Sequence, residues 1–279
     1  MTLPVSVQII TLDEEMNIAD CINSVLQNEP AEIVVIDGGS GDRTVDIAKS
    51  LGATVLTPGR LGRGASRILG YESTTLPYVA MVDADDRLAS NWLEISLDQL
   101  EAGNYAALQS SLRTWGCRNF WETGWNEYYI ESIKPQSDVV MVGHPAIYRR
   151  EALLAARRDV GNDHEDTQLS IDFQARGFRQ GIGTAISRRV VPMNGRENLL
   201  KWFAYGKGYR DLIRKHPDRQ SAVKRHMFWT VPIKRGWSPV SRGKVFQPLF
   251  CLLMAGSIVA GFYAKVDCTG LLPPRSTSV

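Results

Sequence analysis

The sequence predicts an α/β fold in which a mainly parallel sheet carries helices on both faces. Four short runs, mostly of apolar residues, indicate strands. A segment with the apolar spacing of a helix follows each of the first three runs, and another follows the fourth run after a polar turn. The runs are Val5–Ile10, Ile33–Ile36, Ala53–Leu56 and Val79–Val82. Alternation of strand and helix over the first ninety residues favours a parallel sheet, whose ligands lie at the carboxyl ends of its strands.

Further elements are expected along the rest of the chain. We predict a helix over 91–100, strands over 106–109, 139–142 and 146–148, a helix from 149, and a last strand near Ile182. Thr11 or Asp13 is expected to cap the first helix. An aromatic-rich segment, 115–129, is typical of core packing, with an acceptor-binding wall as the functional alternative.

Three carboxylates follow the fourth strand: Asp83, Asp85 and Asp86. Such a cluster repels itself unless it is solvated or balanced by cations. Oxygen ligands of this kind suit Mg²⁺ or Mn²⁺, ions that also hold a substrate phosphate. The alternative is a polar turn before an Asp-capped helix. Asp37 follows the second strand, so Asp37 and Asp83 are expected at the same edge of the sheet.

Several function classes are excluded by what the motifs lack. No glycines follow the first strand, as a dinucleotide-binding fingerprint requires, and Gly62-Arg63-Gly64 is too short and follows the wrong strand. The sequence contains no Walker loop, and its Asp-x-Asp does not lie on the first strand, where an aspartyl phosphatase has it. The four cysteines are scattered, which indicates neither a zinc site nor a disulfide framework.

The C-terminal part combines a basic stretch with an apolar one. Nine Lys and Arg residues lie between Arg214 and Lys244 against one acid, and residues 245–264 carry no charge, about the length of a membrane span. The basic flank favours the cytoplasmic face. We expect a peripheral protein or a single C-terminal span; a helix in the membrane interface and a buried hairpin are the alternatives. The expected parts are a catalytic domain, 1–195, a basic amphipathic helical segment, 196–244, an apolar helix, 245–265, and a tail, 266–279.

Five segments in order across residues 4–185 resemble glycosyltransferase family two, whose members are inverting nucleotide-sugar enzymes with the GT-A fold. The segments are IITLDEEMNIADCINSVL, EIVVIDGGSGDRTVDIA, GRGASRILGY, YVAMVDADDRL, and GHPAIYRREALL with HEDTQLSIDFQARGF. Each is weak alone, and together they are specific. The turn DGGSGDRT departs from the family's usual DDGSTDGT. The Gln-x-x-Arg-Trp signature of processive synthases is missing, which disfavours a polymerising activity.

The resemblance implies roles for individual residues. Thr11, Glu14 and Asp37 would border the nucleoside, although Glu14 also fits a helix-start acid. Asp85, with Asp83 beside it, would bind the metal. Arg63, Arg67 and Lys207 (or Arg210) would approach the diphosphate or sugar. Asp166 would be the general base and Glu165 its neighbour, with His164 a bystander; a capped helix start is the alternative for this pair.

The implied function is metal-dependent transfer of a sugar, with inversion, from a nucleotide-diphosphate sugar to a hydroxyl of a glycan or lipid-linked acceptor. A UDP-sugar is the first choice of donor and a GDP-sugar the second, with Mg²⁺ or Mn²⁺ as cofactor. The expected partners include a membrane and no nucleic acid. The alternatives are a polyprenyl-phosphate glycosyltransferase and a non-catalytic sugar-nucleotide-binding partner in a glycan assembly complex.

Overall fold

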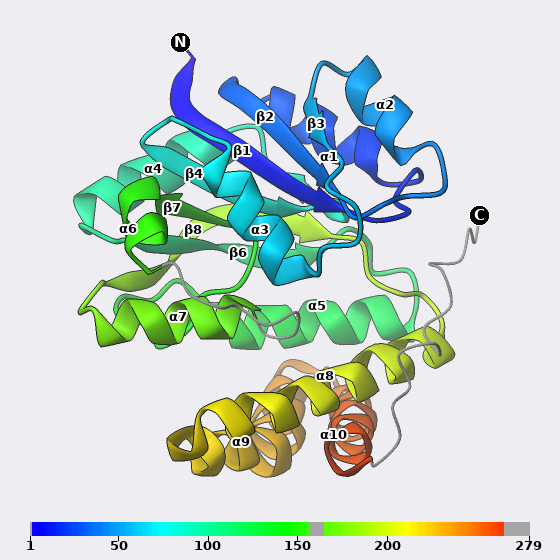
Figure 1. Cartoon of the computed structure of the whole chain (residues 1–279). Helices are drawn as coiled ribbons and strands as arrows, with labels where there is room; N and C mark the ends of the chain where they lie inside the picture. Colours follow the sequence, from blue (N-terminus) through cyan, green and yellow to red (C-terminus); the bar gives the residue numbers. More distant parts are fainter. Residues whose placement is uncertain (1, 157–164, 265–279) are drawn as a thin grey trace. The chain divides into compact units, whose positions relative to one another are not determined.

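A computed structural model describes residues 2–156 and 165–264 of the chain, whose elements are labelled in Figure 1. The chain divides into two compact units, which are considered separately. Of the described residues, unit 1 contains those up to 112 and those between 133 and 189, and unit 2 contains residues 113–132 and 190–264. The aromatic-rich segment therefore belongs with the C-terminal part, whereas the sequence placed it inside a catalytic domain ending at 195.

Unit 1 is built on one sheet, with strand order β3-β2-β1-β4-β7-β6-β8-β5 in the described residues. The first four strands are parallel in the order β3-β2-β1-β4, and β7 then pairs antiparallel to β4. This confirms the predicted parallel core and adds an antiparallel half. The strands are β1 Leu3–Thr11, β2 Pro30–Asp37, β3 Thr54–Leu56, β4 Tyr78–Asp83, β5 Asp86–Leu88, β6 Ala107–Thr114, β7 Ala146–Arg149 and β8 Gln180–Arg189.

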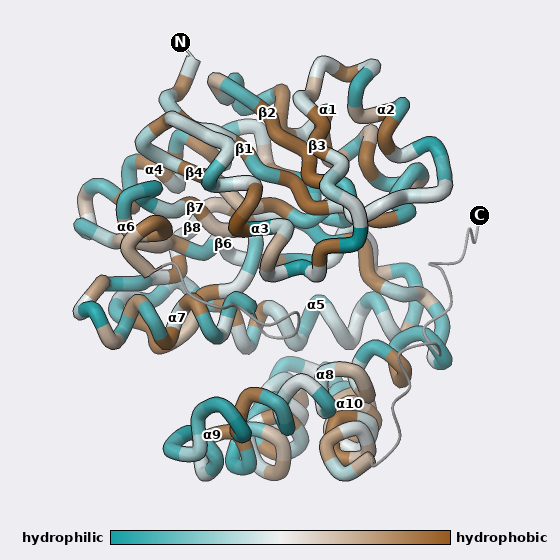
Figure 2. Tube along the Cα trace, in the orientation of Figure 1, coloured by the Kyte–Doolittle hydropathy of each residue, from teal (hydrophilic) through white to brown (hydrophobic). Residues whose placement is uncertain are grey.

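Helices cover both faces of this sheet. One buried cluster joins β1 and β2 to α1, α2 and α4, and another joins β4 and β7 to α3, α6 and α7. The hydrophobic residues of β1 and β2 appear brown in Figure 2. Both faces of a parallel strand are buried in this way, which explains the continuous apolar run Ile33–Ile36 in β2 and the burial of the polar Ser6 and Gln8 within β1. The helices are α1 Ile18–Leu26, α2 Thr44–Ser50, α3 Arg63–Glu72, α4 Trp92–Ala102, α6 Arg150–Ala155 and α7 Glu165–Ala175.

The strand register brings the polar strand ends together. Thr11 at the end of β1 is paired with Asp37 at the end of β2, and its neighbour Ile10 is paired with Asp83 at the end of β4. Parallel strands end at the same edge of a sheet, so Asp37 and Asp83 lie at one edge, as predicted from the sequence.

Two local predictions for this unit are wrong. Residues 139–142 form no strand; the N–H of Val139 donates to the carbonyl of Gln180 in β8 at 2.9 Å, and Val140 is 62% exposed. The first helix begins after Asn17 with no side-chain cap. Asp13 instead accepts the backbone N–H of Gly41 at 2.8 Å, and thereby ties the loop after β1 to the loop after β2.

Unit 2 is helical and has an aromatic core. The rings of Trp125, Trp202 and Phe250 lie 5.2–6.0 Å apart by their centroids, and Trp125 Nε1 donates to Asn198 Oδ1 at 2.7 Å. These contacts support packing as the role of the aromatic-rich segment. The elements are α5 Phe120–Ser132, α8 Gly195–Lys215, η1 Pro217–Arg219, α9 Gln220–Arg225, η2 His226–Arg235, η3 Ser238–Arg242 and α10 Gln247–Tyr263.

The charge-free segment of the sequence forms α10, which packs closely on α8. Gly206 faces the backbone of Ile258, and Gly261 faces the backbone of Phe203; a Cβ at either glycine would overlap that backbone. Among the helices of the described residues, none has the length and apolar character needed to cross a bilayer.

Candidate functional site

An acidic cluster lies where β4 ends. Asp83 is the last residue of β4, Asp85 lies in the turn that follows, and Asp86 is the first residue of β5. One carboxylate oxygen of each lies within 4.8 Å of the others. Three carboxylates this close in a largely buried place need positive charge beside them, because burial weakens the screening that water provides.

Two arginines supply that charge. Arg67 on α3 places Nη2 2.7 Å from Oδ1 of Asp83, and Arg189 at the end of β8 places Nη2 2.9 Å from Oδ2 of the same residue. Arg189 also holds Asp86 through two contacts, Nε to Oδ1 at 2.8 Å and Nη2 to Oδ2 at 2.6 Å. Such two-pronged arginine–carboxylate contacts are strong and fix geometry.

The pKa values of Asp83 and Asp86 are shifted in opposite directions. Burial alone raises the pKa of Asp83, but the Arg67 and Arg189 guanidiniums outweigh it and hold that pKa well below its usual range. Burial raises the pKa of Asp86 to about 7, with Arg189 opposing the rise. Asp83 is therefore a firm anion in the folded protein, whereas Asp86 is close to neutralisation at physiological pH.

The residues present fit a divalent cation, with Asp85 as its best ligand. Both oxygens of Asp83 and of Asp86 contact arginine at 2.9 Å or less, whereas Oδ1 of Asp85 lies 3.7 Å from Arg189 Nε. Even without Asp86, the carboxylates of Asp83, Asp85 and Glu165 outnumber the two guanidiniums that the described residues place beside them, so negative charge is left over. Hard oxygen donors with excess negative charge suit Mg²⁺ or Mn²⁺.

Arg67 joins the acidic cluster to a second acidic pair. Its Nε donates to Oε1 of Glu165 at 3.2 Å, so one buried guanidinium bridges Asp83 and the first residue of α7. Asp166 follows on α7; its Oδ1 accepts the N–H of Thr167 at 2.7 Å. Its Oδ2 is directed at Gly143 and would lie 3.6 Å from a Cβ there. The two motifs, eighty residues apart in sequence, therefore meet at one site.

His144 is a polar group in this site with no protein partner. Its ring is buried, and neither nitrogen hydrogen-bonds to any residue that the structure describes. Burial, followed by the charge of Arg67, lowers its pKa to about 3, against opposing effects of Asp83 and Asp166. Arg67 Nη1 is buried and unpartnered in the same sense. Unmet donors and acceptors inside a protein are costly, and a substrate with hydroxyl or phosphate oxygens would satisfy them.

The residues predicted to border a nucleoside lie at the ends of β1 and β2. Asp37 accepts the N–H groups of Gly39 and Ser40 at 2.9 and 3.0 Å, so its carboxylate shapes its own turn. Glu14 accepts from Asn17 Nδ2 at 2.8 Å. The hydroxyl of Thr11 is buried and has no hydrogen bond to the described residues.

Other predicted residues do not join the cluster. Arg63 is exposed in the first turn of α3, one turn before the buried Arg67. Lys207 and Arg210 lie on α8 in unit 2, where Arg210 donates to the carbonyl of Ala264. His164 lies outside the described residues. The roles of Arg63 and Lys207 toward a donor stay predictions.

Sequence reasoning missed Arg189 and His144. Arg189 ends β8 directly after a second arginine, Arg188, so the local sequence does not indicate which of the two faces the carboxylates. His144 precedes Pro145 within a segment quoted above for its resemblance, and a lone histidine carries no metal-ligand spacing. The available signal was a count of charges: a predicted buried cluster of three carboxylates requires cations from elsewhere in the chain.

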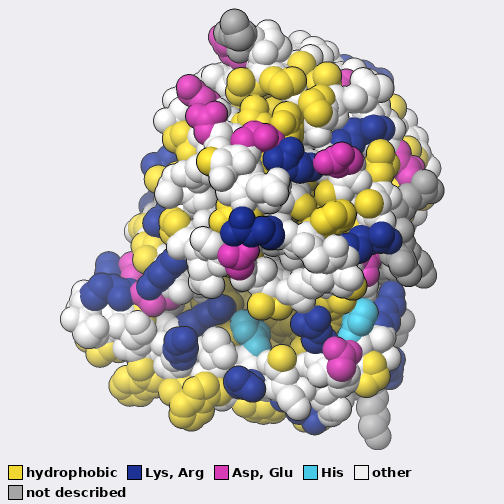
Figure 3. Space-filling view, turned by 90° about the vertical axis from the view of Figure 1, so that its left-hand side faces the viewer, with side chains coloured by type: hydrophobic (Ala, Val, Ile, Leu, Met, Phe, Trp, Pro, Cys, Tyr) yellow, Lys and Arg dark blue, Asp and Glu magenta, His cyan; other side chains and the backbone are white. Residues whose placement is uncertain are grey.

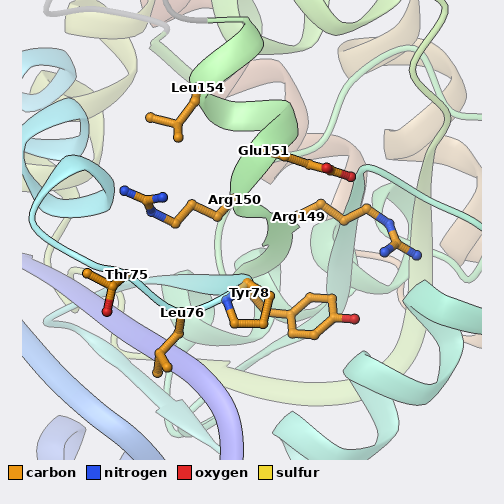
Figure 4. Close-up of a pocket in the computed structure, with 8 residues that line it drawn as sticks. Thr75, Leu76, Tyr78, Arg149, Arg150, Glu151 and Leu154 are labelled. Atoms are coloured by element: carbon orange, nitrogen blue, oxygen red, sulfur yellow. The ribbon is translucent and has the colours of Figure 1, made fainter.

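A separate pocket lies at the opposite end of β4. Its volume is about 300 Å³, and Figure 4 shows its lining residues, among them Tyr78, Arg149 and Arg150. Both arginines are engaged by the protein: Arg149 pairs with Glu101 at 2.8 Å, and Arg150 donates to the carbonyl of Tyr71 at 3.2 Å. Tyr78 begins the strand that Asp83 ends, so this pocket is not part of the acidic site.

Comparison with known proteins gives a family match. The family model described as glycosyl transferase family 2 matches residues 6–155. An uncharacterized glycosyltransferase of Rickettsia typhi is 40% identical over 85 residues, which cover 30% of this chain and 29% of that protein. The chain thus spans less than a third of the length of this curated relative.

Solved structures resemble the whole chain at low sequence identity. The mannosyltransferase PcManGT from Pyrobaculum calidifontis, in complex with GDP-Man and Mn²⁺, has a TM-score of 0.66 at 16% identity, covering 95% of this chain and 89% of that one. S. aureus TarS 1-349 in complex with UDP-GlcNAc has a TM-score of 0.58 at 14% identity, covering 94% and 82%. The fold is that of GT-A glycosyltransferases, as predicted.

Proposed function

Since the chain belongs to glycosyl transferase family 2, we propose that this glycosyltransferase moves a sugar from a nucleotide-diphosphate sugar to a hydroxyl of a glycan or lipid-linked acceptor, with inversion. The observation that carries the proposal is the Arg67 bridge from Asp83 to Glu165. It joins the acidic cluster suited to a donor diphosphate and its metal to the carboxylate pair suited to an acceptor.

In this proposal the donor is a UDP-sugar, with a GDP-sugar as second choice. The similar structures carry UDP-GlcNAc in one case and GDP-Man with Mn²⁺ in the other, which supports this donor class. Asp85 would hold Mg²⁺ or Mn²⁺, with Asp83 beside it. The bound ion would supply Lewis-acid stabilisation of the diphosphate charge. Arg67 Nη1 donates a hydrogen bond to a substrate oxygen, and the neutral His144 ring donates one to a substrate oxygen or accepts one from a substrate hydroxyl.

Asp166 acts as general base in the proposed reaction. Its carboxylate takes the proton of the acceptor hydroxyl while the hydroxyl oxygen attacks the anomeric carbon from the side opposite the diphosphate. The carbon–oxygen bond to the diphosphate breaks as the new bond forms, which inverts the configuration. Glu165, held by Arg67, positions the start of α7 and so the base that follows it. We place the protein at the cytoplasmic face of a membrane, where a lipid-linked or surface-glycan acceptor is made.

Calorimetry of nucleotide binding tests the donor site. UDP is titrated into the protein with and without Mn²⁺, and the same titrations are made with Asp85→Asn. The matched control is Asp98→Asn, which changes an exposed aspartate on α4. We expect Mn²⁺-dependent UDP binding that Asp85→Asn removes and Asp98→Asn retains. Unchanged, metal-dependent binding in Asp85→Asn would refute the assignment of the cluster; GDP binding in place of UDP would overturn the choice of donor.

A further inference from the structure

Unit 2 exposes aromatic side chains along a π-helical segment. Phe228, Trp229, Ile233 and Trp237 are 49%, 60%, 39% and 59% exposed. Phe228 and Trp229 are adjacent in η2, Ile233 follows Trp229 by four residues, and Trp237 lies four residues farther, just before η3, which places the four on one side of the segment. Pro232, which has no N–H to donate, lies inside η2.

The opposite side of the same segment is already packed. Met227 and Val231 are fully buried, and Gly236 lies against Cys251 and Pro248 of α10. The apolar contacts that hold the segment in unit 2 are therefore made by its inner side. The two exposed tryptophans are not needed for these contacts. Large apolar groups gathered at a surface mark an interaction site.

The cations around these aromatics are free of acidic partners. Lys224, Arg225 and Lys234 form no ion pair with any residue that the structure describes. The cations farther along are neutralised: Arg242 pairs with Glu131 at 2.5 Å and Lys244 with Glu127 at 3.4 Å, both on α5. In the lower left of Figure 3, Lys and Arg side chains lie next to exposed hydrophobic ones.

We propose that Phe228, Trp229, Ile233 and Trp237, together with Lys224, Arg225 and Lys234, form a surface that binds the face of an anionic lipid bilayer. Tryptophan is enriched at the level of lipid headgroups because its ring is apolar and its N–H is polar. Lysine and arginine beside it attract the negative leaflet. Hydrophobic and basic groups combined in this way are typical of segments that lie in the interface rather than cross it.

This inference deepens the proposed membrane location and moves the contact away from α10. The outer side of α10 also exposes apolar residues, Leu249 and Leu252 among them, but the cations before it are paired with α5. Charge complementarity with an anionic surface therefore favours η2. The transferase chemistry is independent of this choice, because none of these residues belongs to the acidic site.

Sedimentation with lipid vesicles tests the surface. The full-length protein is mixed with vesicles of phosphatidylcholine alone, or of phosphatidylcholine and phosphatidylglycerol in equal parts. Binding is expected only with phosphatidylglycerol, and it weakens as salt is raised. Lys224→Gln with Arg225→Gln weakens it about 25-fold, since each cation near the surface contributes about fivefold. The matched control, Lys49→Gln with Arg176→Gln, removes two exposed cations of unit 1 and leaves binding unchanged.

A second pair of variants separates the two helical surfaces. Trp229→Ser with Trp237→Ser is expected to weaken vesicle binding about tenfold or more, and Leu249→Ser with Leu252→Ser to leave it unchanged. The reverse pattern, or no binding to phosphatidylglycerol vesicles, overturns the proposal. A wild-type dimer that the tryptophan variant converts to a monomer, seen by light scattering, also overturns it in favour of a second copy. UDP binding is measured by calorimetry without lipid, and vesicle binding is measured without UDP. Failure of the proposed donor site and failure of the proposed membrane surface are therefore recognised separately.

Discussion

Protonation of His144 is expected to make the protein less stable in mild acid. Its ring is 7% exposed, and burial followed by the Arg67 charge lowers its pKa from 6.5 to about 3. Between these two values the unfolded chain binds a proton at this position and the folded protein does not. The contribution to stability is therefore complete above pH 6.5 and is lost progressively as the pH falls toward 3.

The size of the effect follows from the same two values. At pH 5 the unfolded state has gained a proton with a pKa 1.5 units above the solution pH, which lowers the free energy of unfolding by about 2 kcal/mol. Little of this loss is present at pH 7. A change of this size is a large fraction of the stability of an ordinary domain.

Urea denaturation at pH 7 and pH 5, followed by circular dichroism, measures the difference. His144→Asn is expected to reduce the acid-induced loss of stability by about 2 kcal/mol, because asparagine does not titrate. Any direct cost of the substitution is present at both pH values and cancels in the difference. His216→Asn, at the end of α8, is the control. An equal loss between pH 7 and pH 5 in His144→Asn and the wild type would show that His144 accepts a proton in the folded protein.

Two further predictions concern catalysis and packing. Asp166→Asn should lower turnover about 10²–10⁴-fold and leave UDP-sugar affinity unchanged, because a general base acts on the acceptor; a parallel loss of donor affinity would assign Asp166 to the donor site. Gly206→Ala should lower the free energy of unfolding of unit 2 by about 1–3 kcal/mol or more, because the added methyl group overlaps the Ile258 carbonyl. Gly256→Ala, whose methyl group meets open space, should instead stabilise α10 by up to about 1 kcal/mol. Urea denaturation compares the two variants, and equal effects would contradict the α8–α10 contact.

The parallel half of the sheet was predictable because its signal is local. Strands β1, β2 and β4 are buried on both faces and end on a polar residue; β2 and β4 contain continuous apolar runs, and β1 is apolar apart from Ser6 and Gln8. The antiparallel half has weaker runs. The stretch 139–142 is as apolar as a strand, yet Val140 and Met141 are exposed, and hydrophobicity alone does not distinguish this case.

The partners within the site were not predictable, because they come from distant parts of the chain. Arg189 is more than a hundred residues from the aspartates it contacts, and Glu165 is 98 residues from Arg67. Likewise, Trp125 meets Asn198 and Phe250 only after the chain has folded, so residues 113–132 were assigned to the wrong part of the chain. Motif order indicated which carboxylates belong together, and tertiary contacts decide which cations balance them.

The balance of charge also decides which residues report on function alone. Removing Arg67 would leave Asp83 and Glu165 buried with less positive charge, and breaking a buried ion pair costs about 3–5 kcal/mol. A loss of activity in an Arg67 or Arg189 variant would therefore combine unfolding with any effect on the substrate. Oδ1 of Asp85 lies 3.7 Å from Arg189 Nε, so its conversion to asparagine leaves in place the shorter contacts of Arg67 and Arg189 with the other carboxylates of the site. Asp85→Asn thus separates binding of a metal and diphosphate from stability more cleanly than any change to the arginines.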